Sequence, residues 1–161
     1  MKYIKYFIQF IFIILSFSIF KLLGPTLSSN LSGKIFELIG PFFRSKKIIQ
    51  TNIKRGIPNI TSENLENLTK LMWNNYGRLF AEYIFIKDFR YGKLAKKIQI
   101  EGQETVDKIK VSKKQVIFIS GHFSNFELMA MYLEKTGIKL STIYRPLNNI
   151  FLNGIMEGIR K

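Results

Sequence analysis

The sequence predicts an N-terminal membrane helix followed by an α/β domain. Three observations lead to this fold class. An uncharged run rich in Ile, Phe and Leu extends from Tyr6 to Phe20. A long segment with apolar residues every three or four positions follows it, which is typical of an amphipathic helix. Short runs of β-branched and aromatic residues then flank a helical segment, and the order strand, helix, strand predicts a parallel pair with a right-handed crossover.

The composition narrows the classes of function. The chain has 25 Lys+Arg against 11 Asp+Glu, a formal net charge of +14, which points to an anionic partner such as acidic lipid, an acidic carrier protein or nucleic acid. Nucleic acid is disfavoured, because the sequence has no helix-turn-helix, zinc or RNA-recognition pattern and carries a membrane segment. The absence of cysteine and the presence of one histidine exclude disulfides and thiolate or multi-histidine metal sites.

Residues 1–24 are predicted to form a transmembrane anchor. About 20 residues within Tyr3–Leu23 can be helical, which is enough to span a hydrocarbon core. Gly24-Pro25 is expected to end the helix. A cleaved signal peptide is the competing interpretation, but no A-x-A-like cleavage site follows. Basic residues are more numerous after the span than before it, so the body is expected on the cytoplasmic side.

Residues 25–60 are predicted to form membrane-proximal basic helices. Leu31–Phe43 is apolar with few charges, and it is expected to include a short helix in the membrane interface. In Arg44–Ile57, isoleucines recur every four residues and basic residues occupy the other faces. This helix either binds anionic lipid or packs its apolar stripe on the protein body, and the sequence leaves both alternatives open.

Residues 61–161 are predicted to form part of an α/β domain. Thr61 or Ser62 is expected to cap a long helix that runs to about Ile86. Glu82 lies near the apolar face of this helix, either as a solvated or paired carboxylate or with a polar role in a site. The predicted buried face comprises Leu65, Leu68, Met72, Tyr76, Leu79 and Tyr83. The remaining predicted elements are strands at 98–101, 116–119 and 140–143 and helices at 104–110 and 126–135.

The candidate catalytic residues are His122 and Glu127. His122 follows the strand at 116–119, and Glu127 stands five positions later at the start of a helix. Residues five apart on one helix point about 140° apart, so the two side chains can meet only if His122 lies in the preceding loop. A histidine oriented by a carboxylate is a typical general base. The alternative is that Ser124 and Glu127 form a capping box that ties off the helix.

The order of elements adds a third candidate. Arg145 follows the strand at 140–143. His122 and Arg145 are therefore both expected at the carboxyl edge of the sheet, where open α/β sheets bind their ligands.

These residues carry a family resemblance. His122-Phe-Ser-Asn-Phe-Glu127 resembles the H-x4-D/E motif of the glycerolipid acyltransferases, and Tyr144-Arg145-Pro146 with Asn149 resembles the second motif of the lipid A biosynthesis (lauroyl/myristoyl) acyltransferases. The resemblance covers nearly all 161 residues and implies the N-terminal part of a glycerolipid-acyltransferase-like α/β domain. It also implies a single-pass protein of the bacterial inner membrane, with its body on the cytoplasmic face.

The resemblance implies a reaction and a role for each residue. A fatty acyl chain would pass from acyl carrier protein to a hydroxyl of a lipid A precursor, with no cofactor. His122 would deprotonate that hydroxyl and Glu127 would orient His122. Arg145 would bind a phosphate of the lipid or of the carrier, with Asn149 and Tyr144 as further substrate-binding residues. Members of the family usually continue well beyond this second motif, so a truncated or inactive copy is also expected. The alternative function is a non-enzymatic, membrane-anchored basic protein that binds anionic lipid.

Overall fold

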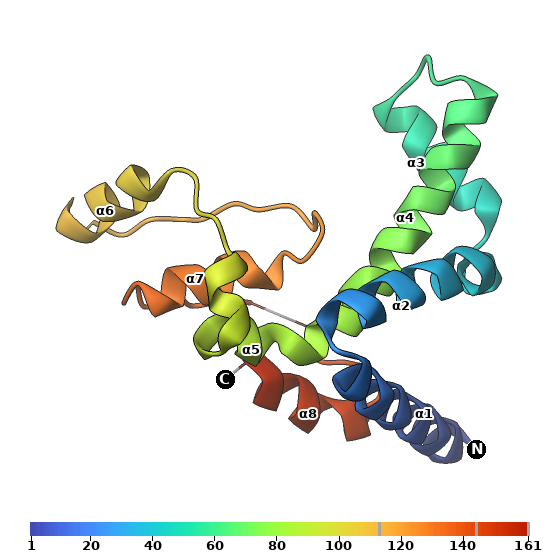
Figure 1. The fold of residues 1–161 in the computed structure, drawn as a ribbon. Helices are drawn as coiled ribbons and strands as arrows, with labels where there is room; N and C mark the ends of the chain where they lie inside the picture. Colours follow the sequence, from blue (N-terminus) through green and yellow to red (C-terminus); the bar gives the residue numbers. More distant parts are fainter. Residues whose placement is uncertain (113, 144, 161) are drawn as a thin grey trace. The chain divides into compact units, whose positions relative to one another are not determined.

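The computed structural model describes residues 1–112, 114–143 and 145–160, so Tyr144 lies outside the described residues. These residues form helices joined by irregular segments (Figure 1). The chain divides into two compact units. One comprises Phe17–Tyr83, and the other comprises Met1–Ser16 together with Ile84–Lys161. The expected division at residues 24 and 60 stays a prediction.

Helix α1 (Lys2–Leu23) matches the predicted anchor segment. Among the described residues it is the one helix that is long enough and apolar enough to cross a membrane. It ends where the sequence predicts, because Gly24 has a φ of 78° and Pro25 opens the next helix. Glycine adopts this left-handed conformation without a steric penalty, and proline is well suited to the first turn of a helix.

The unit Phe17–Tyr83 is built on two long helices, α2 (Pro25–Ile39) and α4 (Ser62–Glu82), which lie side by side (Figure 1). Small residues allow their backbones to approach closely. Ser28, Ser32 and Gly33 of α2 are buried, as is Gly77 of α4. A Cβ atom at Gly77 would lie 2.3 Å from the carbonyl oxygen of Ser32, so only glycine fits at this crossing.

The buried stripe of α4 differs from the predicted one. Tyr76, which was expected to be buried, is 52% exposed. The predicted face contains large apolar residues alone, whereas the buried ridge follows every fourth residue and includes small ones. The buried residues of α4 are Leu65, Thr69, Trp73, Gly77 and Ala81.

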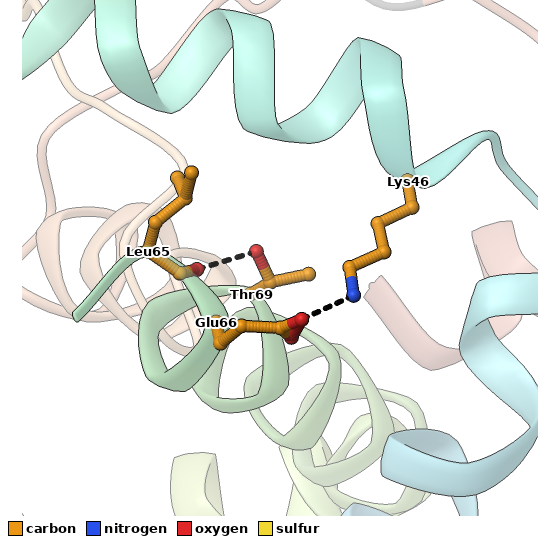
Figure 2. Close-up of polar contacts among 4 residues, drawn as sticks. All are labelled: Lys46, Leu65, Glu66 and Thr69. Carbon is orange, nitrogen blue, oxygen red and sulfur yellow. Dashed lines mark hydrogen bonds and ion pairs between the residues drawn. The ribbon is translucent and has the colours of Figure 1, made fainter. Parts of the chain in front are cut away.

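Local signals at the start of α4 are confirmed. Thr61 is the N-cap, and its hydroxyl accepts a hydrogen bond of 3.2 Å from the backbone N–H of Asn64. One turn later, the Thr69 hydroxyl donates to the Leu65 carbonyl at 2.7 Å (Figure 2). The helix ends at Glu82, and the 3-10 turn η2 (Tyr83–Phe85) leads on to α5.

Helix α3 (Lys46–Gly56) lies against α4 and buries Ile49. Part of its apolar stripe therefore packs on the protein body, although Ile57 is 49% exposed, and this packing supports the second of the two alternatives for this segment. Lys46 of α3 also forms an ion pair with Glu66 of α4 (Figure 2). The hydrogen bond from Lys46, followed by the charge of Lys46, holds the pKa of Glu66 below its ordinary value.

A polar network also joins α2 to α4. The Ser29 hydroxyl donates to Glu82 Oε1 at 2.7 Å, and Arg78 Nη1 donates to that hydroxyl at 3.4 Å. Arg78 Nε donates to Asn74 Oδ1 at 2.6 Å, and the Asn74 amide donates to Glu37. Glu82 is thus a paired carboxylate in the helix interface, which is the first of the two roles predicted for this residue.

The second unit contains α5 (Ile86–Tyr91), η3 (Lys93–Lys97), α6 (Gln103–Ser112), α7 (Glu127–Lys135) and α8 (Ile150–Arg160). Helices α6 and α7 agree closely with the helices predicted at 104–110 and 126–135. Helix α5 contacts both α7 and α8. Arg90 of α5 is 5% exposed and pairs with Glu134 of α7, while Lys135 Nζ donates to the Arg90 carbonyl at 2.8 Å.

The predicted α/β fold is wrong. The described residues contain no strand, and the segments 98–101, 116–119 and 140–143 are irregular. Several of their apolar side chains are exposed, with Ile117 at 88% and Ile119 at 92%. β-Branched residues are common in strands because they pack well on a sheet. A strand also needs a neighbouring strand to complete its hydrogen bonds, and the residue types alone cannot supply one. The parallel strand pair expected from the order of elements is therefore absent from the described part of the chain.

Candidate functional site

Three of the predicted site residues line one cavity. It has a volume of about 860 Å³, and its walls include His122, Glu127 and Arg145. The three side chains come from separate segments: the loop before α7, the start of α7 and the stretch before α8. The structure therefore brings them to one cavity although the sheet that was expected to do so is not formed.

His122 and Glu127 have the local placement that a dyad requires. His122 is an exposed residue of the irregular segment before α7, and Glu127 is the first residue of α7. The imidazole packs against Phe126, with ring centroids 4.3 Å apart and the rings inclined at 60°. Glu127 is half-buried at the N-terminus of this helix. The contact between the imidazole and this carboxylate stays a prediction.

The capping-box alternative is wrong. The N-cap of α7 is Phe126, and no side chain caps this helix. A capping box would make Glu127 the third helical residue, whereas it is the first. Ser124 adopts a left-handed conformation with a φ of 43°, outside the helix. Glu127 is therefore not used to tie off the helix as the third residue of a capping box.

Arg145 and Asn149 occupy different environments. Arg145 is exposed at the cavity wall. Asn149 is 6% exposed and caps α8, because its Oδ1 accepts a hydrogen bond of 3.1 Å from the N–H of Phe151. Its Nδ2 donates to the Tyr6 carbonyl of α1 at 2.8 Å. Asn149 thereby fixes the start of α8 and the end of the segment that carries Arg145, while its contact with substrate stays a prediction.

Helix α8 adds residues that the sequence analysis did not select. Asn153, Met156 and Glu157 line the same cavity as His122. The backbone N–H of Leu147 donates to Asn153 Oδ1 at 2.9 Å, which folds the segment after Arg145 back onto α8. Their spacing of three and four residues places them on one side of a helix, and this was the available signal in the sequence.

His122 also lines a second, larger cavity. Its volume is about 1120 Å³, and His122 and Phe126 belong to the walls of both cavities. About half of the residues that line this second cavity are apolar, among them Ile109, Val116, Phe118, Met129, Leu133 and Leu140, and Lys110, Lys114 and Lys139 line it as well. His122 is therefore shared by two cavities that each combine apolar and charged side chains.

The described residues around His122 include no cluster of side chains suited to a metal ion. Among the residues with described positions, no group of three or more His, Asp or Glu side chains could hold a metal ion. The cavity lined by His122, Glu127 and Arg145 instead offers one imidazole, carboxylates and one guanidinium. This combination suits proton transfer and the binding of an anionic group.

Comparisons with known proteins agree with the motifs. A family model described as "Bacterial lipid A biosynthesis acyltransferase" matches residues 1–161. Neither a curated protein nor a solved structure matches the chain. Because the family model extends over residues 1–161, the chain belongs to the bacterial lipid A biosynthesis acyltransferase family.

Proposed function

We propose that this protein transfers a fatty acyl chain from acyl carrier protein to a hydroxyl of a lipid A precursor. The observation that carries the proposal is the single cavity lined by His122, Glu127 and Arg145. Family membership supports acyl transfer to a lipid acceptor in general terms. The carrier-protein donor and the roles of the three residues are the parts that the proposal adds.

In the proposed reaction, His122 accepts the proton of the acceptor hydroxyl as its oxygen attacks the thioester carbonyl. The new C–O bond forms, the C–S bond breaks, and the departing thiolate takes the proton back from the imidazolium. Glu127 orients the imidazole and stabilises its protonated form. Arg145 binds a phosphate of the acceptor or of the carrier's phosphopantetheine arm through charge-assisted hydrogen bonds.

The two cavities support a division of labour around His122. The apolar side chains in the wall of the larger cavity suit an acyl chain, because burial of each CH₂ group is favourable by about 0.8 kcal/mol. The cavity that contains Arg145 suits the polar, phosphate-bearing part of a substrate. Asn149 contributes by fixing the segment after Arg145, and Tyr144 is proposed as a further substrate contact.

The proposal includes a location at the membrane. Helix α1 is long and apolar enough to cross a bilayer, and the basic residues that follow it favour a body on the cytoplasmic face of the bacterial inner membrane. Acyl carrier protein and lipid A precursors are both acidic. The net charge of +14 is complementary to each of them and would favour their association with the chain.

The test is transfer of a labelled acyl group from acyl carrier protein to a lipid A precursor, using the full chain in membranes. His122→Ala is expected to lower the rate by about 10²–10⁴, the usual loss for a general base. Thr105→Ala, an exposed position on α6, is the control and is expected to retain the full rate. A His122→Ala protein that transfers at the wild-type rate would remove His122 from the mechanism.

A second function is favoured by one observation, the net charge of +14 on a chain with a candidate membrane helix. Under this alternative, the chain is a membrane-anchored basic protein that binds anionic lipid without catalysis. Acyl transfer, measured alongside binding to vesicles with and without anionic lipid, separates the two functions. A wild-type chain that binds anionic vesicles but transfers no acyl group would favour the alternative.

A further inference from the structure

The outward side of α2 and of the 3-10 turn η1 (Gly40–Phe42) is apolar. Large side chains recur along it at intervals of four, four, three and four residues, so they share one side of the helix. They are well exposed, with Leu38 at 76% and Phe42 at 89%. We call this set the α2 stripe, and it consists of Leu27, Leu31, Ile35, Leu38 and Phe42.

The α2 stripe cannot turn into the core of its own unit. The opposite side of α2 is occupied by α4, against which Ser28, Ser32 and Gly33 are buried. Rotation of α2 would replace these small residues with leucines where the Gly77 backbone lies against Ser32. The stripe therefore stays on the surface of the unit Phe17–Tyr83 for as long as the α2–α4 contact exists.

The charges around the α2 stripe are basic. Lys34 lies on the same side of α2, four residues before Leu38, and Arg44 and Lys47 are exposed shortly after the stripe ends. The acidic residue of α2, Glu37, accepts a hydrogen bond from Asn74 of α4. An apolar helix face with basic neighbours is typical of a helix that lies in the interface of an anionic bilayer.

The position of the α2 stripe in the chain favours a membrane as its partner. A single residue, Gly24, separates α2 from α1, the helix long and apolar enough to cross a membrane. The chain therefore leaves that helix and enters α2 at once. The neighbouring basic helix α3 is a weaker candidate, because it buries Ile49 and lies against α4.

We infer that the α2 stripe is a second membrane contact, which inserts Leu27, Leu31, Ile35, Leu38 and Phe42 into the interfacial layer of an anionic leaflet. Lys34 and Arg44 meet the lipid phosphates beside it. The contact holds the α2–α4 pair at the bilayer surface. It concerns membrane placement alone, and it holds whether or not the chain catalyses acyl transfer.

The test uses spin labels, which the sequence makes simple because the chain has no cysteine. Leu38→Cys carries a nitroxide on the stripe, and Leu71→Cys carries one on α4 as the matched control. Leu71 is also an exposed leucine, at 53%, but its neighbours four residues away are Asn67 and Asn75. The full chain is reconstituted in vesicles of phosphatidylcholine and phosphatidylglycerol, and collisions with oxygen and with a water-soluble nickel complex are measured.

Oxygen concentrates in the bilayer and the nickel complex in water, so the ratio of their collision rates reports depth. The ratio at residue 38 is expected to be several-fold higher than at residue 71, and the difference is expected to shrink in phosphatidylcholine alone. Equal ratios at the two positions would overturn the proposal, and a difference unaffected by phosphatidylglycerol would overturn its anionic part. Protection from both reagents with spin–spin broadening would show a second copy of the chain on the stripe, which also overturns it.

Discussion

The unit Phe17–Tyr83 and the segment from Ile84 to Arg160 differ in how their side chains are covered. In the first, the backbones of α2 and α4 meet closely where Gly77 lies against Ser32, and a polar network joins the two helices. In the second, apolar residues such as Ile117 and Ile119 stand exposed, and the candidate catalytic groups surround a cavity between short helices and irregular segments. Packing and candidate chemistry thus belong to different parts of the chain. Binding and catalytic residues often lie on loops and irregular segments, as His122 and Arg145 do.

Three substitutions test this comparison, and the largest effect among them is expected for Arg145. Loss of a charge-assisted hydrogen bond to a phosphate costs about 1.5–3 kcal/mol, so Arg145→Ala is expected to raise KM by about 10–150-fold. Because the side chain is exposed, thermal unfolding is expected to be unchanged. Steady-state kinetics with the lipid acceptor and with the acyl carrier protein varied in turn identifies which substrate the guanidinium binds. An unchanged KM for both substrates would remove Arg145 from the site.

A smaller effect, on the free energy of unfolding, is expected at Gly77. A Cβ atom there would lie 2.3 Å from the Ser32 carbonyl oxygen, so Gly77→Ala forces α2 and α4 apart. Overpacking of this kind costs about 1–3 kcal/mol in the free energy of unfolding. Gly56→Ala is the control, since a Cβ atom at Gly56 meets nothing within 4 Å. Chemical denaturation in detergent measures both variants, and equal stabilities would contradict the close contact between the two helices.

The smallest effect is expected at Glu66. Its pKa is lowered in the folded chain by the hydrogen bond from Lys46 and by the charge of Lys46. A depressed carboxyl pKa contributes stability above the unfolded-state value, and this contribution is lost as the pH falls through the folded-state value. The difference in stability between the wild-type chain and Glu66→Gln should therefore be constant near neutral pH and shrink on acidification below about 4.5. Denaturation at a series of pH values measures it, and a difference that grows in acid would contradict the ion pair.

Elements defined by local signals could be predicted from the sequence. The Thr61 cap and the break at Gly24-Pro25 each act within a few residues, and the structure has both. The strands could not be predicted in the same way, because a strand depends on a partner distant in the sequence. At 116–119 the residue types favoured a strand, but among the described residues no neighbour completes it.

The candidate site shows the same limit. The motif spacing indicated His122, Glu127 and Arg145, and the structure places all three at one cavity. The motif spacing could not indicate that Asn149 is buried against α1, since the Tyr6 carbonyl that Asn149 contacts lies 143 positions away in the sequence. The buried face of α4 was misjudged for a related reason, because Gly77 is buried by the approach of α2 rather than by its own hydrophobicity.

The most direct test of the proposed mechanism is a double-mutant cycle on the transfer rate. The wild-type chain, His122→Ala, Glu127→Gln and the double variant are compared in the same membranes. If Glu127 acts only through the imidazole of His122, the double variant should be no slower than His122→Ala alone, because residues that act as a unit are strongly non-additive. Losses that multiply, so that the double variant is slower than His122→Ala by the full factor of Glu127→Gln, would contradict the dyad.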